Sequence, residues 1–242
     1  MAAVADAEHR GAERQESERR EPAHHRLYGR ARGKALTAHQ KRLMEDVLPR
    51  MRVDLGDPTE GHDKVWLEVG FGAAHHLLHQ ARSNPDVLVL GAEPFLNGVA
   101  KAVAGAHAEG LGNLRLHPGD ARDILANLPD ASLARAFVLY PDPWPKARHN
   151  KRRLVQEDFL AAMARVLRPG ATLRFASDVK DYVDWVLARA RRTPAPGAPA
   201  FHWHPTRAAD FLDPPEGWVE TTFERRAKRE GRVPHYVDFV RG

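Results

Sequence analysis

Four acidic residues follow apolar, strand-like runs and could together form a binding pocket. Glu68, Glu93, Asp120 and Asp142 each stand at the end of such a run or in the turn after it. In open α/β sheets, ligands bind outside the carboxyl ends of the strands, and an acid after the second strand can accept both hydroxyls of a ribose. Carboxylates there repel phosphate and attract an ammonium or a sulfonium. The set predicts a pocket for a cationic nucleoside, and S-adenosylmethionine fits that description.

A glycine-containing turn separates the first predicted strand from its helix. Gly70 and Gly72 would let the backbone approach a ligand closely. A dinucleotide-binding G-x-G-x-x-G motif starting at Gly70 would need its third glycine where His75 stands. The turn therefore favours a nucleoside without a pyrophosphate. Asp120, after the third strand, could accept a hydrogen bond from an adenine amino group.

The stretch 137–153, FVLYPDPWPKARHNKRR, combines a strand pattern with a dense cationic run. Residues 137–140 are apolar and β-favouring, and the prolines that follow cannot continue a ladder. Asp142, Trp144 and Lys146 should therefore lie just beyond a strand end, in the crevice.

A cationic run directly follows these residues, and it comprises Arg148, His149, Lys151, Arg152 and Arg153. Such a run in isolation is typical of a solvated surface or a helix start. Beside a candidate pocket, and with Arg30, Arg32 and Lys34 elsewhere, it favours contacts with phosphates.

Alternating strand and helix patterns supply the scaffold for these residues. Because strands and helices alternate, we expect an α/β fold with a mostly parallel sheet and helices on both faces. The strand patterns cover 64–70, 87–93, 114–117, 135–140 and 172–177, and the helix patterns cover 73–82, 94–108, 121–128, 155–167 and 181–192. Asp178 follows the fifth strand and should face the same crevice.

The remaining segments are predicted to flank a single domain over residues 27–242. Residues 1–26 lack apolar periodicity, which is typical of a disordered tail. Residues 27–50 read as a basic arm followed by a docking helix, which a Thr37–Gln40 capping box begins and Pro49 ends. The Pro-rich stretch 193–217 is expected to be a loop or lid. The runs 219–223 and 236–240 are expected to close the sheet as a hairpin-like pair.

Composition excludes several classes of protein. The 242 residues carry a formal net charge of +5, which suits nucleic acid, an anionic membrane or an acidic partner, and the absence of cysteine excludes disulfides and thiolate metal sites. No apolar run could cross a bilayer, so we expect a soluble, cytoplasmic protein without a membrane role. His75 and His79 have the spacing of a helical metal pair, but no acid stands between them as in H-E-x-x-H, and no metal is expected.

Seven strings in this chain resemble, in the same order, the tRNA (guanine-N7-)-methyltransferase family. They are LEVGFG, GAEP, GDA, YPDPWPKARHNKRRLVQEDFL, RVLRPG, SDVKDY and TTFERRAKREGR, and the resemblance covers the chain from about residue 30 to the end. The resemblance implies a Rossmann-like class I methyltransferase fold, whose seven-stranded sheet has one antiparallel strand. It also implies transfer of a methyl group from S-adenosylmethionine to N7 of guanosine 46 in the tRNA variable loop, without an obligatory protein partner.

The resemblance also assigns roles to individual residues. It implies that Asp142 is catalytic, and that the cofactor is bound by Glu68, Gly70, Gly72, Glu93, Asp120 and Asp142. It implies that the substrate is met by Lys146, Asp178, Thr221, Thr222, Phe223 and Glu224, and the RNA by Arg148, His149, Asn150, Lys151, Arg152 and Arg153. This chain departs from many members at Ala74, where they carry glycine. A Cβ there is expected to narrow the methionine end of the pocket.

The chemistry of the acceptor leaves alternatives open. Guanine N7 carries an exposed lone pair, so no base must remove a proton before it attacks a methyl group. Asp142 would hold the guanine edge or stabilise the growing positive charge; alternatively, it forms a turn among prolines. A methyltransferase for an exocyclic amine would be expected to carry D-P-P-aromatic, whereas this chain reads Asp142-Pro143-Trp144. A non-catalytic RNA-binding protein on the same fold is the third possibility.

Overall fold

The computed structural model describes residues 28, 29, 31, 33–192 and 198–242. The predicted disordered tail, residues 1–26, lies outside the described residues. So do Arg30 and Arg32 of the basic arm and the first part of the Pro-rich stretch, residues 193–197.

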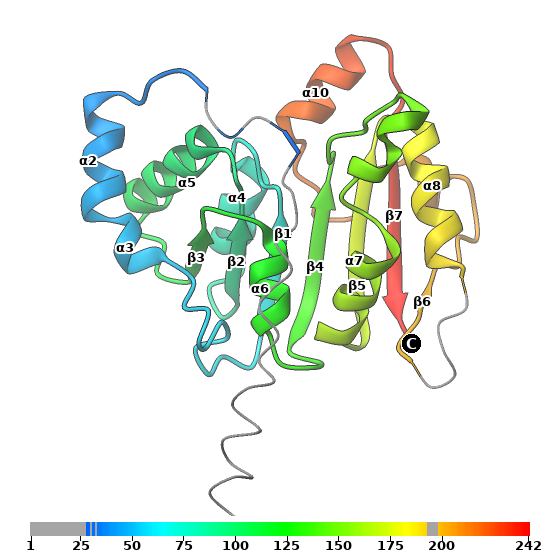
Figure 1. Ribbon diagram of the computed structural model, residues 1–242, viewed down its shortest axis with the longest axis horizontal. Helices are drawn as coiled ribbons and strands as arrows, with labels where there is room; N and C mark the ends of the chain where they lie inside the picture. The colour runs from blue at the N-terminus through cyan, green and yellow to red at the C-terminus, as the bar shows by residue number, and fades with distance from the viewer. Residues whose placement is uncertain (1–27, 30, 32, 193–197) are drawn as a thin grey trace, which may run out of the picture.

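In the described part of the chain, seven strands form one sheet in the order β3-β2-β1-β4-β5-β7-β6 (Figure 1). Neighbouring strands are parallel except at β7, which runs antiparallel to both β5 and β6. The predicted mostly parallel sheet is therefore confirmed. The strands are β1 Val65–Val69, β2 Leu88–Ala92, β3 Leu114–His117, β4 Leu133–Leu139, β5 Leu167–Ser177, β6 Phe201–His202 and β7 His235–Arg241.

Helices cover both faces of this sheet. The helices of the described residues are α2 Ala38–Asp46, α3 Leu48–Met51, α4 His75–Ser83, α5 Leu96–Glu109, α6 Ala121–Asn127, α7 Glu157–Val166, α8 Lys180–Ala190, α9 Ala209–Leu212 and α10 Thr222–Arg229, with the 3₁₀ helix η1 at Ala147–Arg152. Figure 1 shows α6, α7 and α8 in front of the sheet and α10 above the carboxyl end of β4. Helix α10 therefore lies over the end of the sheet where the predicted acids lie.

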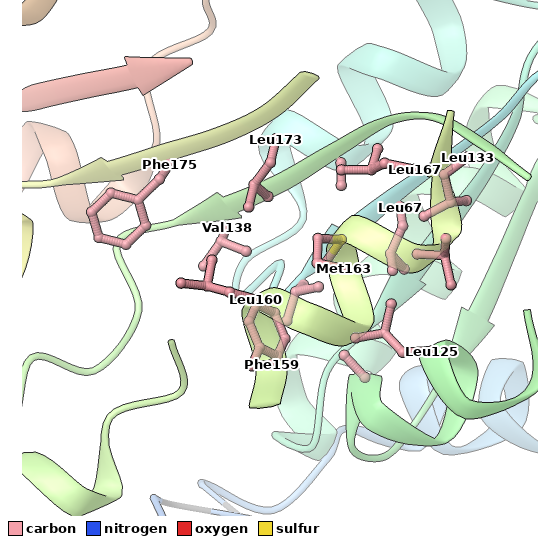
Figure 2. Close-up of a cluster of buried hydrophobic side chains, with 14 of the residues drawn as sticks. Leu67, Leu125, Leu133, Val138, Phe159, Leu160, Met163, Leu167, Leu173 and Phe175 are labelled. Atoms are coloured by element: carbon pink, nitrogen blue, oxygen red, sulfur yellow. The ribbon is translucent and has the colours of Figure 1, made fainter. Parts of the chain in front are cut away.

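Two apolar clusters attach the helices to the strands. The first joins α6, α7 and α8 to β1, β4 and β5, and Figure 2 shows Met163, Phe159 and Leu67 among its members. The second joins α2 to α5 and strands β2 and β3 on the other face. Each fully buried leucine or phenylalanine in these clusters contributes about 1.5–3 kcal/mol. This packing holds the carboxyl ends of the strands in fixed relative positions.

The docking helix starts as predicted but ends differently. Thr37 Oγ1 accepts from the Gln40 backbone N–H and the Gln40 side chain accepts from the Thr37 N–H, which confirms the capping box. Pro49 does not end the helical region, because it lies in the first turn of α3, where its missing N–H costs no hydrogen bond.

One prediction near the carboxyl terminus is wrong in part. Residues 219–223 do not form a strand, because Thr221 caps α10 and Thr222 is its first residue. The strand expected at 236–240 is present as β7, and its antiparallel partners are β5 and β6. The described part of the Pro-rich stretch, predicted to be a loop or lid, contains the short elements β6 and α9.

Candidate active site

Three of the predicted acids converge where adjacent strands end. Glu68 lies on β1, Glu93 directly follows β2, and Asp142 follows β4; β1 pairs with both β2 and β4. The negative charges of Asp142 and Glu68 add to burial in raising the pKa of Glu93. Among the described residues, no lysine or arginine forms an ion pair with any of the three. Glu68 lies 2.7 Å from His76 Nδ1, and the cluster of three carboxylates suits a cationic ligand.

Glu93 is built into the glycine turn. It is buried, its Oε2 accepts from the Gly72 N–H at 2.7 Å, and its Oε1 accepts from the Phe95 N–H at 2.8 Å. Burial is the largest cause of its raised pKa, and the two N–H groups partly oppose that shift. A Cβ at Gly98 would lie 2.3 Å from the Gly72 carbonyl oxygen. Only glycine at that position lets α5 pack so closely against the turn.

The two turn glycines adopt a backbone conformation that favours glycine, and so does Ala74. The φ angles are 72° at Gly70, 53° at Gly72 and 65° at Ala74. The Ala74 side chain is fully buried and packs in the apolar cluster that joins α4 and α5. The expectation that its Cβ narrows the pocket stays a prediction. The left-handed φ of Ala74 costs a residue other than glycine about 1 kcal/mol.

Asp120 is held more tightly than the other acids. It caps α6, with its Oδ1 accepting from the Arg122 N–H at 3.0 Å and its Oδ2 from the Arg122 guanidinium at 2.9 Å. The predicted contact with an adenine amino group would have to share a carboxylate that already serves as a helix cap and an ion-pair partner.

Asp142 is the exposed acid of the three. Partial desolvation by surrounding protein atoms raises the pKa of its carboxyl group. Because the residue is exposed to solvent, a ligand can reach its carboxylate. A Cβ built at Gly29 would lie 3.2 Å from Asp142 Oδ2, so the basic arm passes beside this carboxylate.

An aromatic and cationic cluster adjoins Asp142. The Trp144 ring meets those of Tyr28 and His149 edge-on, with centroids 6.2 and 5.9 Å apart. The Arg152 guanidinium lies 5.0 Å from the Trp144 centroid and 5.2 Å from that of Tyr28. Trp144 adopts a φ of 43°, which is strained for a bulky residue and is typical of functional sites.

The predicted RNA-contact run divides by exposure. Lys146, Arg148 and Lys151 are exposed on or beside η1, and His149, Asn150 and Arg152 are half-buried. The three exposed cations are free to meet an anion.

Arg153 is buried, and its predicted contact with RNA is wrong. It retains 1% exposure, its Nε donates to the Pro143 carbonyl at 2.9 Å, and its guanidinium pairs with Asp181. The same group lies 4.9 Å from the ring centroids of both Tyr182 and Trp185. The carboxylate and the aromatic faces offset the cost of burying the charge. Arg153 therefore anchors the loop to α8.

The prediction for Glu224 as a substrate contact is also wrong in this structure. Its side chain is fully buried, and its carboxylate accepts from Trp218 Nε1 at 2.7 Å and from the Tyr236 hydroxyl at 2.6 Å. Sequence reasoning missed its helix. The signal was Thr221-x-x-Glu224, a capping-box spacing, and Thr221 Oγ1 does accept from the Glu224 N–H at 3.1 Å.

Its neighbours Thr222 and Phe223 are exposed beside the glycine turn and the start of α4. Phe223 is 51% exposed, and a Cβ at Gly72 would lie 3.3 Å from its ring. Thr222 Oγ1 lies 3.2 Å from His75 Nδ1. The structure thus brings the 221–224 segment and the glycine turn together.

Asp178 lies after β5 as predicted, and its carboxylate is engaged by the protein. It pairs with Arg232 Nε at 2.6 Å, and its side chain is 14% exposed. Any contact of Asp178 with substrate would therefore also involve Arg232, because the two side chains form an ion pair.

His76 belongs to the site, and sequence reasoning missed it. Its Nδ1 lies 2.7 Å from Glu68 Oε2, and its Nε2 lies 3.1 Å from Gln80 Nε2. The signal in the sequence was that His76 stands in the first turn of the helix that follows the Gly70 turn. Among the described residues, no group of three or more His, Asp or Glu side chains is arranged to hold a metal ion.

Hollows elsewhere on the surface do not contain the predicted residues. One, of about 570 Å³, lies between the last turn of α8 and β6 and is lined by Leu187, Phe201 and Trp203 among others. None of the helices in the described part of the chain is long and apolar enough to span a membrane.

Comparisons with known proteins agree on one class of enzyme. The family described as "Putative methyltransferase" matches residues 62–233. The tRNA (guanine-N(7)-)-methyltransferase of Jannaschia sp. (strain CCS1) is 44% identical over 230 residues, covering 89% of this chain and 94% of the relative. The enzyme of the same name from Azorhizobium caulinodans is 43% identical and covers 100% of both chains.

Solved structures show the same fold at lower identity. The 16S rRNA methyltransferase KamB is 23% identical with a TM-score of 0.54, over 76% of this chain and 91% of its own. TrmN from Thermus thermophilus is 18% identical with a TM-score of 0.50, over 84% of this chain and 48% of its own. These likenesses support the class I methyltransferase fold.

Proposed function

This chain belongs to the tRNA (guanine-N(7)-)-methyltransferase family, and we propose that it methylates N7 of a guanosine in tRNA with S-adenosylmethionine as the methyl donor. The target we propose is guanosine 46 of the variable loop, with 7-methylguanosine as the product. We place the reaction in the cytoplasm and expect no obligatory protein partner and no metal. The observation that carries the proposal is the buried Glu93 beside Glu68 and Asp142, which forms no ion pair with a lysine or arginine of the described residues.

The residues of the crevice fit S-adenosylmethionine. Glu93, which accepts from the Gly72 N–H, would also accept hydrogen bonds from ribose hydroxyls, and Gly70 and Gly72 would allow close approach of a ligand to the backbone. Glu68 and Asp142 supply negative charge for a sulfonium. When bound, the donor supplies an electrophilic methyl group whose bond electrons return to sulfur.

The protein's contribution to the reaction is alignment. Guanine N7 has a lone pair in the plane of the base and needs no general base. The exposed Asp142 would accept from the N1 and amino edge of the guanine and stabilise the positive charge that develops on the ring. Trp144 would pack beside that base.

Exposed cations next to the mouth would hold the RNA. Lys146, Arg148 and Lys151 lie on or beside η1, within a few residues of Asp142. Phosphate contacts fix orientation without reading sequence. The loop would thus bring a guanosine to the crevice, while Arg153 holds the loop in place.

The test is to incubate the purified protein with S-adenosylmethionine carrying a labelled methyl group and unmodified tRNA, and to map the label. We expect label at N7 of guanosine 46. Label on an exocyclic amine would identify a methyltransferase with another acceptor. Binding of tRNA without label would identify a non-catalytic RNA-binding protein, and either result would contradict the proposal.

A further inference from the structure

Four polar side chains on and beside α4 form a hydrogen-bonded network that ends at an acid of the crevice. His76 and Gln80 lie one turn apart on α4, Asn84 follows the helix as its C-cap, and Glu68 lies on β1. Glu68, His76 and Gln80 retain only 3%, 2% and 8% exposure. Polar groups buried this deeply are satisfied by one another, so the direction of each hydrogen bond can be worked out. We call these four residues the α4 network.

A backbone carbonyl fixes the direction of the hydrogen bonds in the α4 network. Asn84 Nδ2 lies 2.9 Å from the Gln80 carbonyl oxygen, which can only accept, so the Asn84 amide presents its NH₂ group there. The same NH₂ group lies 3.5 Å from Gln80 Oε1, so the Gln80 side chain turns its oxygen toward Asn84 and its own NH₂ group toward His76. His76 Nε2, which lies 3.1 Å from Gln80 Nε2, therefore accepts a hydrogen bond.

His76 consequently carries its proton on Nδ1. In a neutral imidazole one nitrogen accepts and the other donates, and the accepting nitrogen here is Nε2. Nδ1 lies 2.7 Å from Glu68 Oε2 and donates to it. A neutral ring orients the carboxylate without cancelling its charge, whereas an imidazolium would pair with it. The second oxygen of Glu68, Oε1, accepts no hydrogen bond from the described residues, so it is left for a ligand.

Aromatic side chains hold the His76 ring in this orientation. Phe137 meets the ring edge-on, with centroids 4.8 Å apart, and the Trp218 ring lies 5.8 Å away on a tilted plane. A histidine that is fixed by its neighbours and by both ring nitrogens can hold a carboxylate in one position, as the outer partners of a binding site do. The α4 network therefore sets both the position and the charge of Glu68.

We propose that His76 and Gln80 are positioning residues for the methyl donor. Gln80 holds His76 as the neutral Nδ1–H tautomer, and His76 holds the charged Glu68 carboxylate toward the cationic methionine end of the donor. Neither side chain touches the donor itself. This inference rests on the proposed function and deepens it, because it assigns the residues that prepare the site for a cationic ligand.

The first test compares two ligands that differ at the methionine end. S-adenosylhomocysteine carries the ammonium group of the amino acid, and adenosine lacks it. His76→Leu removes the donor to Glu68 and should weaken binding of S-adenosylhomocysteine about tenfold, while binding of adenosine changes less than about twofold. His76→Asn supplies an amide N–H in place of Nδ1–H, and its affinity should stay within about threefold of wild type. Isothermal titration calorimetry measures all four affinities.

A double-substitution cycle tests whether Gln80 acts through His76. Gln80→Met removes the donor to Nε2 and should weaken binding of S-adenosylhomocysteine about fivefold in the wild-type background and less than about twofold in a His76→Leu background. His79→Leu, which changes a half-buried histidine of the same helix, is the control and should leave both affinities unchanged. Equal losses in both backgrounds, or a matching loss of adenosine affinity in His76→Leu, would overturn the inference.

A readout without any ligand separates this inference from the proposed function. In ¹⁵N NMR spectra of wild-type protein at neutral pH, the His76 ring should show a protonated Nδ1 and a bare Nε2. A proton on Nε2, alone or together with one on Nδ1, would overturn the inference, and this result is obtained even if His76→Leu does not fold. If wild-type protein binds neither S-adenosylmethionine nor S-adenosylhomocysteine, the proposed function fails, and the spectrum still decides whether Gln80 fixes the tautomer of His76.

Discussion

The 140–153 loop and residues 218–224, here called the entry segment because they lead into α10, each contain one buried charged side chain among more exposed neighbours. In the loop this residue is Arg153, and in the entry segment it is Glu224. Both were expected to contact substrate or RNA. The comparison shows that a charged residue in a substrate-facing segment can instead fix that segment to the core.

The two anchors differ in what balances their charge. Arg153 pairs with Asp181 and lies between aromatic rings, and these partners all belong to α8. Glu224 receives donors from the entry segment itself, from β7 and from the second turn of α10. The loop is therefore held by one helix, and the entry segment is held to the sheet. The loop presents exposed cations to solvent, and the entry segment presents the half-exposed ring of Phe223.

The largest expected effect concerns the exposed acid of the loop. Asp142→Asn should preserve folding and donor binding and lower turnover by about 10²-fold or more, because it removes charge stabilisation where charge develops. Since the pKa of Asp142 lies above its ordinary value of 3.8, wild-type kcat should fall as pH is lowered through that raised pKa. The Asn variant should lack this fall. Single-turnover rates across pH test both points.

An exposed aspartate at the opposite end of the sheet, before the first residue of β1, is the control for this substitution. Asp63→Asn should leave turnover and its pH profile unchanged. If Asp142→Asn retained near wild-type turnover, Asp142 would be a turn residue, and the loop would contribute only RNA contacts.

The next effect compares the anchor of the loop with its exposed neighbour. Arg153→Ala should cost about 2–4 kcal/mol of unfolding free energy, from lost packing and an unsatisfied Pro143 carbonyl. Arg148→Ala should stay within about 0.5 kcal/mol. Urea denaturation at neutral pH measures both. Equal stabilities would show that the loop does not depend on its buried arginine.

Salt dependence tests whether the loop or α10 carries the phosphate contacts. Replacing Arg148 and Lys151 together by alanine should reduce the slope of log affinity against log salt by about one per side chain. Replacing Arg225 and Arg229 on α10 gives the matching value for the other region. Lys64→Ala, at the amino end of β1, is the control and should leave the slope unchanged. A slope that the loop pair does not alter would remove those residues from the RNA contact.

The smallest effect concerns the cap of the entry segment. Thr221→Ala should cost about 1 kcal/mol, because it leaves the Glu224 N–H without its acceptor. Thr221→Ser keeps an oxygen in place and should cost less. Thermal unfolding of the two variants distinguishes them. A strand at 219–223 would show no such difference, so equal stabilities would contradict the helix cap.

The elements around the acids could be predicted from the sequence to a large extent. Strand periodicity and the Thr37–Gln40 box are local signals, and the structure follows them. The proline and glycine boundaries were less reliable, because Pro49 lies within α3 and β5 runs through Pro169 and Gly170. The wrong prediction at 219–223 came from reading β-branched and aromatic residues as a strand while the Thr221-x-x-Glu224 cap was overlooked. Local propensity was ambiguous there, and the cap decided it.

The sequence alone determined the alternating α/β order, the placement of acids after strands and the membership of a methyltransferase family, because these depend on patterns between near neighbours. Only the tertiary structure decided which charges face solvent. Arg153 meets Asp181, and Glu224 meets Tyr236, across separations of 28 and 12 residues. Whether a charged side chain reaches RNA or is buried as an anchor depends on such distant partners, since burial is favourable only where they offset the lost hydration.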